Sequence, residues 1–331
     1  VKYNDGDSAN PVNFSYARKW TITLVACTFT GLSAAAASSY NLGFDSIIPA
    51  LNCTQFQATV GLAVYPLGFG IVPIFTAPFS EELGRRPLYI VSALGFMLMH
   101  LMVAEAKNIQ TVILARLLGG GFGSTGATMV GGSIADIWRP SERGLPMSIF
   151  AVAAVGSTGL GPVAAGWIQA NPHLQWRWIQ WLHVIVTALC LVLLVLFMRE
   201  TRTSVILTRR TKKLRAETGD DRYRSVAEIE LPSLKTLLII SCTRPLRLLL
   251  TEPVVASFSL WIGFAWGILY CMVEYVPVSP AHRLLNSPRH PRCPRTLHVA
   301  RATSTSPTSP ARPPHRQPSP SHHTRGPPRH Q

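Results

Sequence analysis

The chain has few charged residues for its length, and this scarcity argues against an ordinary soluble enzyme. Aspartate, glutamate, lysine and arginine make up 14% of its 331 residues, whereas soluble domains contain about 25%. The mean hydropathy is +0.23, and 47% of the residues are hydrophobic. This composition is typical of an integral membrane protein.

Motifs for catalysis, cofactors and metals are missing. The six cysteines are scattered, with no Cys-x-x-Cys pair and no His–Cys spacing suited to a metal. The sequence also has no phosphate-cradling glycine loop, zinc spacing or nucleophile triad. We therefore expect no enzyme activity, no cofactor and no metal, and most cysteines should pack as small hydrophobic residues.

Acidic residues are absent from 278–331, although this stretch holds 9 arginines, 12 of the 26 prolines and 7 of the 10 histidines. Without it the net charge of +15 falls to +6, so the basic composition does not indicate a nucleic-acid-binding protein. The stretch has no hydrophobic periodicity and cannot build a core. We expect a disordered tail that arises from a frame change or an unspliced intron. The alternative is a disordered basic tail that binds acidic partners.

Seven hydrophobic runs approach the length of about 20 residues that a membrane-spanning helix needs. We predict an all-α membrane protein with a cytoplasmic segment over 1–19, a six-helix bundle over 20–198, a basic cytoplasmic connection over 199–253 and a seventh span over 254–277. Within the connection, we predict a surface helix that lies on anionic lipid or is simply solvated. The seven runs are Trp20–Tyr40, Phe56–Phe79, Leu88–Ala104, Thr111–Gly132, Leu145–Ile168, Ile179–Met198 and Val254–Val276.

Lysine and arginine are distributed unevenly between the connections, and this bias predicts the orientation. With the N-terminus in the cytoplasm, basic residues gather on that side, and in the connections between runs only Lys107 and Arg177 lie opposite. The basic tail after the seventh run would lie opposite as well, against this rule. We expect a multi-pass protein of the plasma membrane; a seven-span receptor would need the reverse orientation. Four tryptophans on the predicted outer side should lie in the headgroup layer, and ordinary packing is the alternative for any one of them. They are Trp167, Trp176, Trp178 and Trp181.

A charged motif separates the second and third runs. Gly84, which permits a tight reversal, is followed by Arg85 and Arg86. Charges at helix ends can pair with a neighbouring helix, so we predict a cytoplasmic gating network; anchoring by positive charge and solvated loop charge are the alternatives. The network would comprise Glu81, Gly84, Arg85, Arg86, Asp136 and Arg143.

Two spans contain unusual residues. Arg116 lies inside the apolar fourth run, where a charge is costly and marks a functional site by default; a snorkelling arginine is the alternative. In the fifth run, Pro162 removes a backbone donor and bends a helix. The surrounding Gly156, Gly161 and Gly166 let a neighbour pack there. This pattern favours a helix that kinks during alternating access, and a simple packing face is the alternative.

These motifs, in this order, resemble the major facilitator superfamily, specifically fungal twelve-helix drug:proton antiporters that export polyamines and drugs. The segment around Gly84 looks like the motif after span two, although Glu81 stands where that motif usually has aspartate. The Arg116 segment looks like the span-four motif, and 156–166 looks like the antiporter motif, which implies export. Flanking segments add to the likeness over roughly 10–277: Gln175–Trp178, Arg199–Thr201, Arg244–Pro245 and Glu252–Pro253.

The resemblance implies proton-coupled export of a small cationic or amphipathic substrate across the lipid membrane, with no nucleic acid involved. Arg116 would lie near the coupling machinery. Glu274, the only acid in the seventh run, would face the central cavity or lie at the interface. Because the family continues with five more helices, we expect a chain truncated after the seventh helix. Transport would then be lost or need pairing with a complementary half, and a non-transporting fragment or regulatory half-transporter is the alternative.

Overall fold

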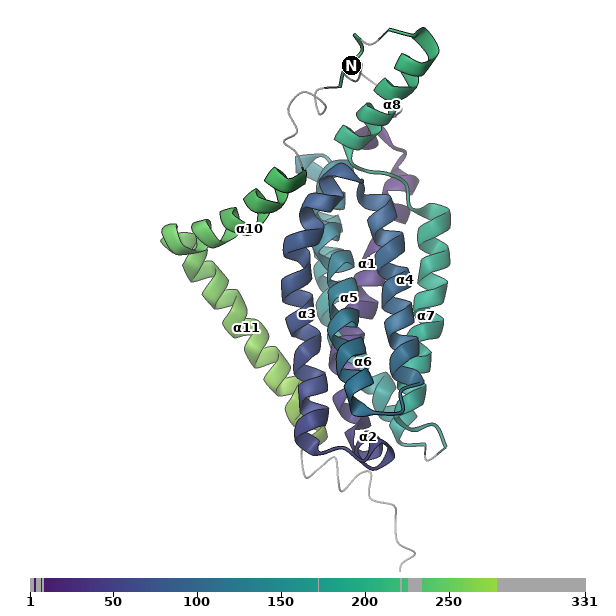
Figure 1. The fold of residues 1–331 in the computed structure, drawn as a ribbon, viewed down its shortest axis with the longest axis vertical. Coiled ribbons are helices and arrows are strands. Elements are labelled where there is room, and N and C mark those ends of the chain that lie inside the picture. The colour runs from purple at the N-terminus through teal and green to yellow at the C-terminus, as the bar shows by residue number, and fades with distance from the viewer. Residues whose placement is uncertain are drawn as a thin grey trace, which may run out of the picture. The chain divides into compact units, whose positions relative to one another are not determined.

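The computed structural model describes residues 3, 7, 9–171, 173–220, 222–225 and 234–278, and these residues form helices and turns without a strand (Figure 1). This confirms the predicted all-α class, while residues 279–331 of the predicted tail lie outside the description. The helices are α1 (Tyr16–Ser39), α2 (Phe44–Leu51), α3 (Gln55–Glu82), α4 (Arg85–Ala104), α5 (Ile109–Ile137), α6 (Gly144–Gln169), α7 (Gln175–Phe197), α8 (Thr203–Thr218), α10 (Leu234–Thr251) and α11 (Pro253–Val278), with short 3-10 turns η1 (Pro11–Asn13), η2 (Asn41–Gly43) and η3 (Pro140–Glu142).

The predicted runs coincide with α1, α3, α4, α5, α6, α7 and α11, to within five residues at either end. Among the described residues, six helical stretches are long and apolar enough to cross a membrane. The glycine-rich α5 is not one of them. It has 29 residues and packs against α1, α3 and α4, so it crosses with its neighbours. The stretches are 16–51, 55–76, 85–104, 144–169, 175–197 and 253–272.

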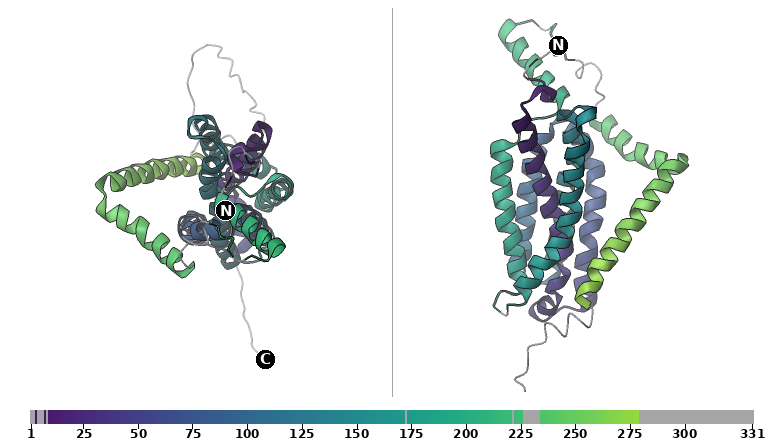
Figure 2. Two further views of the ribbon diagram at one scale, coloured as in Figure 1. Left: turned by 90° about the horizontal axis from the view of Figure 1, so that it is seen from above. Right: turned by 180° about the vertical axis from the view of Figure 1, so that it is seen from behind.

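The first six long helices form one bundle in which α5 packs against α3, α4 and α1, while α1 also contacts α6 and α7 (Figure 2). Glycines set the closest approach. A Cβ atom on Gly120 of α5 would overlap the backbone carbonyl of Tyr65 on α3, and one on Gly68 of α3 would overlap the carbonyl of Leu117. Small residues let helix backbones touch in this way.

Large apolar side chains cover the outside of the bundle, including Val152, Leu160 and Leu189, as expected for a surface that faces lipid. Trp176 is an exception to the predicted headgroup position. Its ring is buried beside Tyr40, because the first turn of α7 packs against α2 and η2. For Trp176 the prediction of an interfacial side chain is therefore wrong.

The charged motif is not a loop. Helix α3 continues through Glu82 and α4 begins at Arg85, so only Leu83 and Gly84 connect them. Gly84 has a φ of 93°, a left-handed conformation that glycine adopts at little cost. This one residue supplies the reversal, and its neighbours can remain helical. Asp136 likewise lies in the last turn of α5 rather than in a connection.

The connection after α7 contains two helices. The predicted surface helix overlaps α8, which ends at Gly219 in a left-handed cap. Helix α10 departs from the predicted polar connection: its apolar residues recur at helical spacing, and it packs against α3. In α11 the described side chains up to Met272 are largely exposed.

The N-terminal segment lies at the same end of the bundle as α8. Arg210 of α8 forms an ion pair with Asp7 at 2.6 Å. A backbone hydrogen bond from Ala9 and the Arg210 guanidinium hold the pKa of Asp7 below its usual value. An even number of spans separates the two segments, so they lie on the same side of the membrane, which the basic-residue bias predicts to be cytoplasmic.

Candidate functional site

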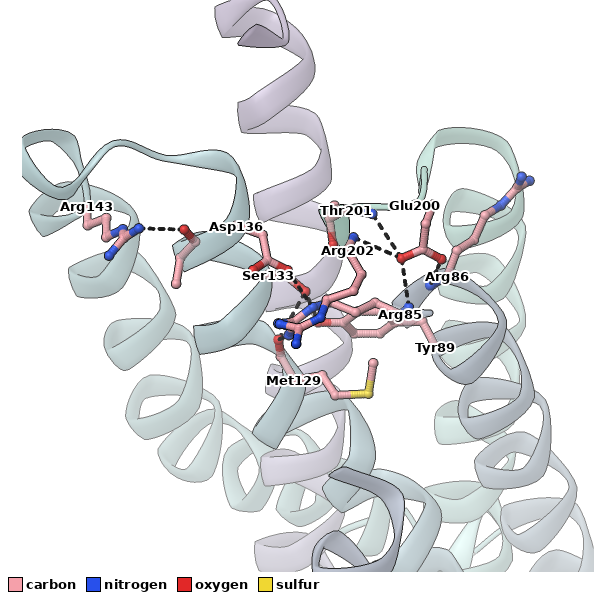
Figure 3. Close-up of polar contacts among 11 residues, drawn as sticks. Arg85, Arg86, Tyr89, Met129, Ser133, Asp136, Arg143, Glu200, Thr201 and Arg202 are labelled. Atoms are coloured by element: carbon pink, nitrogen blue, oxygen red, sulfur yellow. Dashed lines mark hydrogen bonds and ion pairs between the residues drawn. The ribbon is translucent and has the colours of Figure 1, made fainter. Parts of the chain in front are cut away.

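The buried ion pair between Arg85 and Asp136 joins α4 to α5 at the α8 end of the bundle (Figure 3). The Nε atom of Arg85 lies 2.8 Å from Oδ2 of Asp136, and its Nη1 donates to the carbonyl of Met129 at 3.0 Å. Arg85 is only 8% exposed. A Cβ atom on Gly132 would overlap the guanidinium, so this glycine makes room for it.

Glu200, just after α7, caps the N-terminus of α4. Its Oε1 accepts the backbone N–H of Arg85 at 2.9 Å, and its Oε2 accepts that of Arg86 at 3.3 Å. Oε1 also accepts hydrogen bonds from the backbone N–H groups of Thr201 and Arg202, at 3.1 and 3.0 Å. A carboxylate there satisfies free donors and the positive end of the helix dipole. A Cβ atom on Gly84 would overlap this carboxylate.

The other two arginines of the predicted network, Arg86 and Arg143, donate hydrogen bonds to backbone carbonyls. Arg86 Nη2 donates to Val195 of α7 at 3.2 Å. Arg143 donates from Nε to Trp138 at 2.9 Å and from Nη2 to Ala135 at 2.6 Å, so it closes the C-terminal end of α5. Arg86 therefore adds a tie to α7, whereas Arg143 stabilises one helix end.

Of the six predicted network residues, four meet around Glu200: Gly84, Arg85, Arg86 and Asp136. Arg143 instead bonds the carbonyls of Trp138 and Ala135, and the side chain of Glu81 lies outside the described residues. We call Arg85, Arg86, Asp136 and Glu200 the charge cluster. It ties α4, α5 and α7 together at one end of the bundle.

Arg116 lies in the interior, 2% exposed, and three helices position it. Its Nη1 donates to Ala36 of α1 at 3.0 Å, and its Nε donates to Gly61 of α3 at 3.3 Å. The guanidinium stacks on the rings of Tyr40 and Tyr65, with 4.2 and 4.6 Å from Cζ to the ring centroids. Such stacking stabilises a cation away from water. The predicted alternative, a snorkelling side chain, does not describe this burial.

The predicted antiporter segment lies within α6, which stays helical across Pro162. Its glycines differ. A Cβ atom on Gly161 would lie 2.7 Å from the carbonyl oxygen of Ala35 on α1, whereas Gly156 and Gly166 have nothing within 4 Å. In this arrangement only Gly161 of the three is needed for packing on α1.

Replacing Gly161 with alanine should lower the stability of the bundle by about 2 kcal/mol, because α6 must move away from the α1 backbone. The measurement is the Tm of the purified protein in detergent. Gly156→Ala is the matched control and should leave Tm unchanged or slightly higher, since alanine favours helix. Equal losses in both variants would contradict the close contact.

The family of the chain follows from its sequence match. Residues 21–285 match the family model of the Major Facilitator Superfamily. The chain belongs to this superfamily. The seven predicted spans and the motif order therefore agree with membership of the Major Facilitator Superfamily, and the chain is a multi-pass membrane protein of a transporter family.

Individual superfamily members are similar to it. The transporter paaT of Penicillium rubens is 32% identical over 278 residues, covering 84% of this chain and 50% of that protein. The efflux pump bik6 of Gibberella fujikuroi is 33% identical over 281 residues, covering 82% and 55%. The solved proton:xylose symporter XylE shares the fold, with TM-score 0.53 and 18% identity over 74% of this chain and 57% of that chain. The chain spans about half the length of the curated relatives it matches.

Sequence reasoning missed Glu200 and the tyrosine cradle of Arg116. Glu200 was noted only as part of a segment flanking span six, although an acid directly after a span could have suggested a helix cap. Tyr65 carries no such signal, because its contact with Arg116 depends on how α3 and α5 pack. The side chain of Glu274 lies outside the described residues, so its predicted place at the cavity stays a prediction.

Proposed function

We propose that the protein exports small cationic or amphipathic compounds in exchange for protons by alternating access, paired with a complementary set of helices. Arg116 carries the proposal. Its buried guanidinium is held by carbonyls and aromatic rings from α1 and α3, and a buried charge of this kind marks a functional site in membrane proteins. The antiporter-like segment on α6 and the name of the similar efflux pump bik6 support the direction of export.

The charge cluster fits the same mechanism. Alternating access moves helix bundles as nearly rigid bodies around a central site, so the helices within one bundle must stay together. Arg85, Asp136 and Glu200 tie α4, α5 and α7 at one end, which keeps this bundle rigid while it moves. Pairing is proposed because the chain spans about half the length of its relatives. The proposal that the exported compounds include cations rests on Glu274, whose carboxylate would attract a positive charge.

The test measures efflux of a cationic dye, or of spermidine, from cells that lack their own exporters, under an imposed pH gradient. The chain is expressed alone and with the second half of a related transporter. We expect efflux only with the second half, and a loss of at least about tenfold in Arg116→Lys, because lysine cannot donate in a fork or stack in the same way.

The matched control is Arg222→Lys, an exposed arginine that should leave efflux unchanged. Membrane insertion of each variant is checked by surface labelling. Unchanged efflux in Arg116→Lys, or no efflux from an inserted wild-type pair, would overturn the proposal. Efflux by the chain alone would support export and contradict the need for pairing.

A further inference from the structure

The membrane-spanning helices of the bundle have few groups that can carry a proton. In α1, α3, α4, α5, α6 and α7, every aspartate and glutamate lies in a terminal turn at the charge-cluster end. Histidine is the side chain whose ordinary pKa lies close to neutral pH. Seven of the ten histidines lie in 278–331, and His173 precedes α7, so only His100 and His183 lie within these helices.

These two histidines meet inside the bundle. His100 of α4 and His183 of α7 stack, with ring centroids 4.9 Å apart and an angle of 28° between the rings. They are 3% and 7% exposed. His100 Nδ1 lies 2.7 Å from Oε1 of Gln180, and His183 Nε2 lies 3.0 Å from Oγ of Ser39. Polar partners therefore fix the positions of both rings.

The bond to Gln180 determines where a proton can bind. An amide oxygen only accepts, so the Nδ1 atom of His100 must donate. The lone pair of the neutral ring then lies on Nε2. This atom is buried and has no hydrogen-bond partner among the described residues. His100 thus presents an open proton acceptor in the bundle interior.

A cavity provides access to the pair. It has a volume of about 470 Å³ and lies between α1, α6 and α7. His183 and Ser39 line its wall, together with apolar side chains such as Leu32 and Ile149. His100 does not line the cavity and stacks behind His183. A proton arriving through water in the cavity would reach His183, and the stacked His100 ring would lie directly beside the new charge.

The charges around the pair limit it to one proton. Two stacked imidazolium rings would repel each other, and the Arg116 cation, which bonds Ala36 three residues before Ser39 on α1, would add to the repulsion. Helix α6 contains no ionisable side chain. At the level of the pair, the neighbouring titratable or charged groups are Tyr40 and Tyr65 against Arg116, Cys27 on α1, Cys190 and Arg177 on α7, Glu105 after α4, and exposed Asp45 on α2. The remaining groups of α1, α4 and α5 lie toward the charge-cluster end: Tyr16, Arg18, Lys19, Arg85, Arg86, Tyr89 and Asp136.

We propose that His100 and His183 form the proton-binding site of this bundle, and this rests on the proposed proton-coupled export. A proton from the cavity binds a ring-nitrogen lone pair and makes one of the two rings an imidazolium; its release to water restores two neutral rings. The added charge repels Arg116, which three helices hold. Protonation therefore weakens the packing of α1, α4, α5 and α7 around the two histidines and Arg116, and it favours a different arrangement of the helices.

The first experiment detects the proton directly and needs no transport. Hydrogen–deuterium exchange at the C2 carbon of each histidine is followed by mass spectrometry, on the purified full chain in nanodiscs, from about pH 5 to 9. We expect His100 and His183 to titrate together. His183→Gln should shift the His100 midpoint by about one pH unit, a tenfold change in proton affinity, and His173→Gln should not. Rings that do not titrate in this range, or an unmoved midpoint, would overturn the proposal.

The second experiment tests coupling with the paired transporter. In His100→Gln and in His183→Asn, dye efflux driven by a pH gradient should fall at least about tenfold, while dye exchange without a gradient should persist. Gradient-driven efflux equal to wild type would overturn the coupling role even if the rings titrate. If wild-type efflux fails, the proposed function fails, while the exchange experiment still decides whether the pair binds a proton. The Tm of each variant shows that it is folded.

Discussion

Replacing Gly120 with alanine is expected to destabilise the bundle by about 3 kcal/mol, the upper end of the cost of overpacking. The added Cβ would overlap the carbonyl of Tyr65 on α3. Backbone cannot swing aside as a side-chain tip can, so α3 and α5 must separate. The reciprocal contact of Gly68 with the Leu117 carbonyl would open with it.

The consequences should be large because α5 is the helix around which the bundle packs. A domain has a net stability of only about 5–15 kcal/mol, so the variant should show a lower Tm and a smaller monodisperse fraction after purification in detergent. Loss of the α3–α5 spacing would also displace Arg116, whose bond to Gly61 crosses this contact.

Gly119→Ala is the matched control for Gly120→Ala. The two glycines are neighbours in α5, but a Cβ on Gly119 would meet only the Met99 side chain, at the ordinary distance of 3.4 Å. Its Tm should stay near that of the wild type or rise with the better helix propensity. If both variants lost the same stability, the cause would be helix propensity or insertion, and the close crossing of α3 and α5 would be wrong.

The hydrophobic runs predicted the helices well because the length of a span is a local property. A bilayer requires about 20 apolar residues in sequence, and all seven runs meet helices within five residues. The structure at the helix ends was harder to predict from the sequence. The charged motif resembled a loop, yet Gly84 alone makes the turn, and the cap of α4 comes from Glu200, 115 positions after Arg85. Such partners follow from packing and not from neighbouring residues.

The same limit applies to the glycines and the histidines. Gly156, Gly161 and Gly166 look alike in sequence, but only Gly161 faces a backbone. His100 and His183 are separated by 83 positions and gave no motif, although the scarcity of acids in the spans was visible. Helix α10 was missed because basic residues and Pro245 concealed its apolar spacing. Sequence patterns predicted which residues are unusual, and the packing determined which of them meet.

Replacing Asp136 with asparagine is expected to cost about 3 kcal/mol, the lower end of the cost of removing one partner of a buried ion pair. Asparagine preserves the shape but leaves the guanidinium of Arg85, 8% exposed, without its carboxylate at 2.8 Å. Tm in detergent measures the loss. Glu217→Gln is the control, because its 3.7 Å pair with Lys213 is exposed on α8 and such surface pairs contribute little.

A double variant separates the ion pair from other effects of the substitution. If the loss arises from an uncompensated Arg85 charge, Arg85→Gln combined with Asp136→Asn should be more stable than the sum of the two single losses predicts. Strictly additive losses would mean that Asp136 acts through something other than Arg85. The backbone cap from Glu200 does not involve the Arg85 side chain, so it remains in every variant of this cycle. The coupling therefore measures how strongly the ion pair itself holds α4 to α5, the tie that rigid-body movement of the bundle requires.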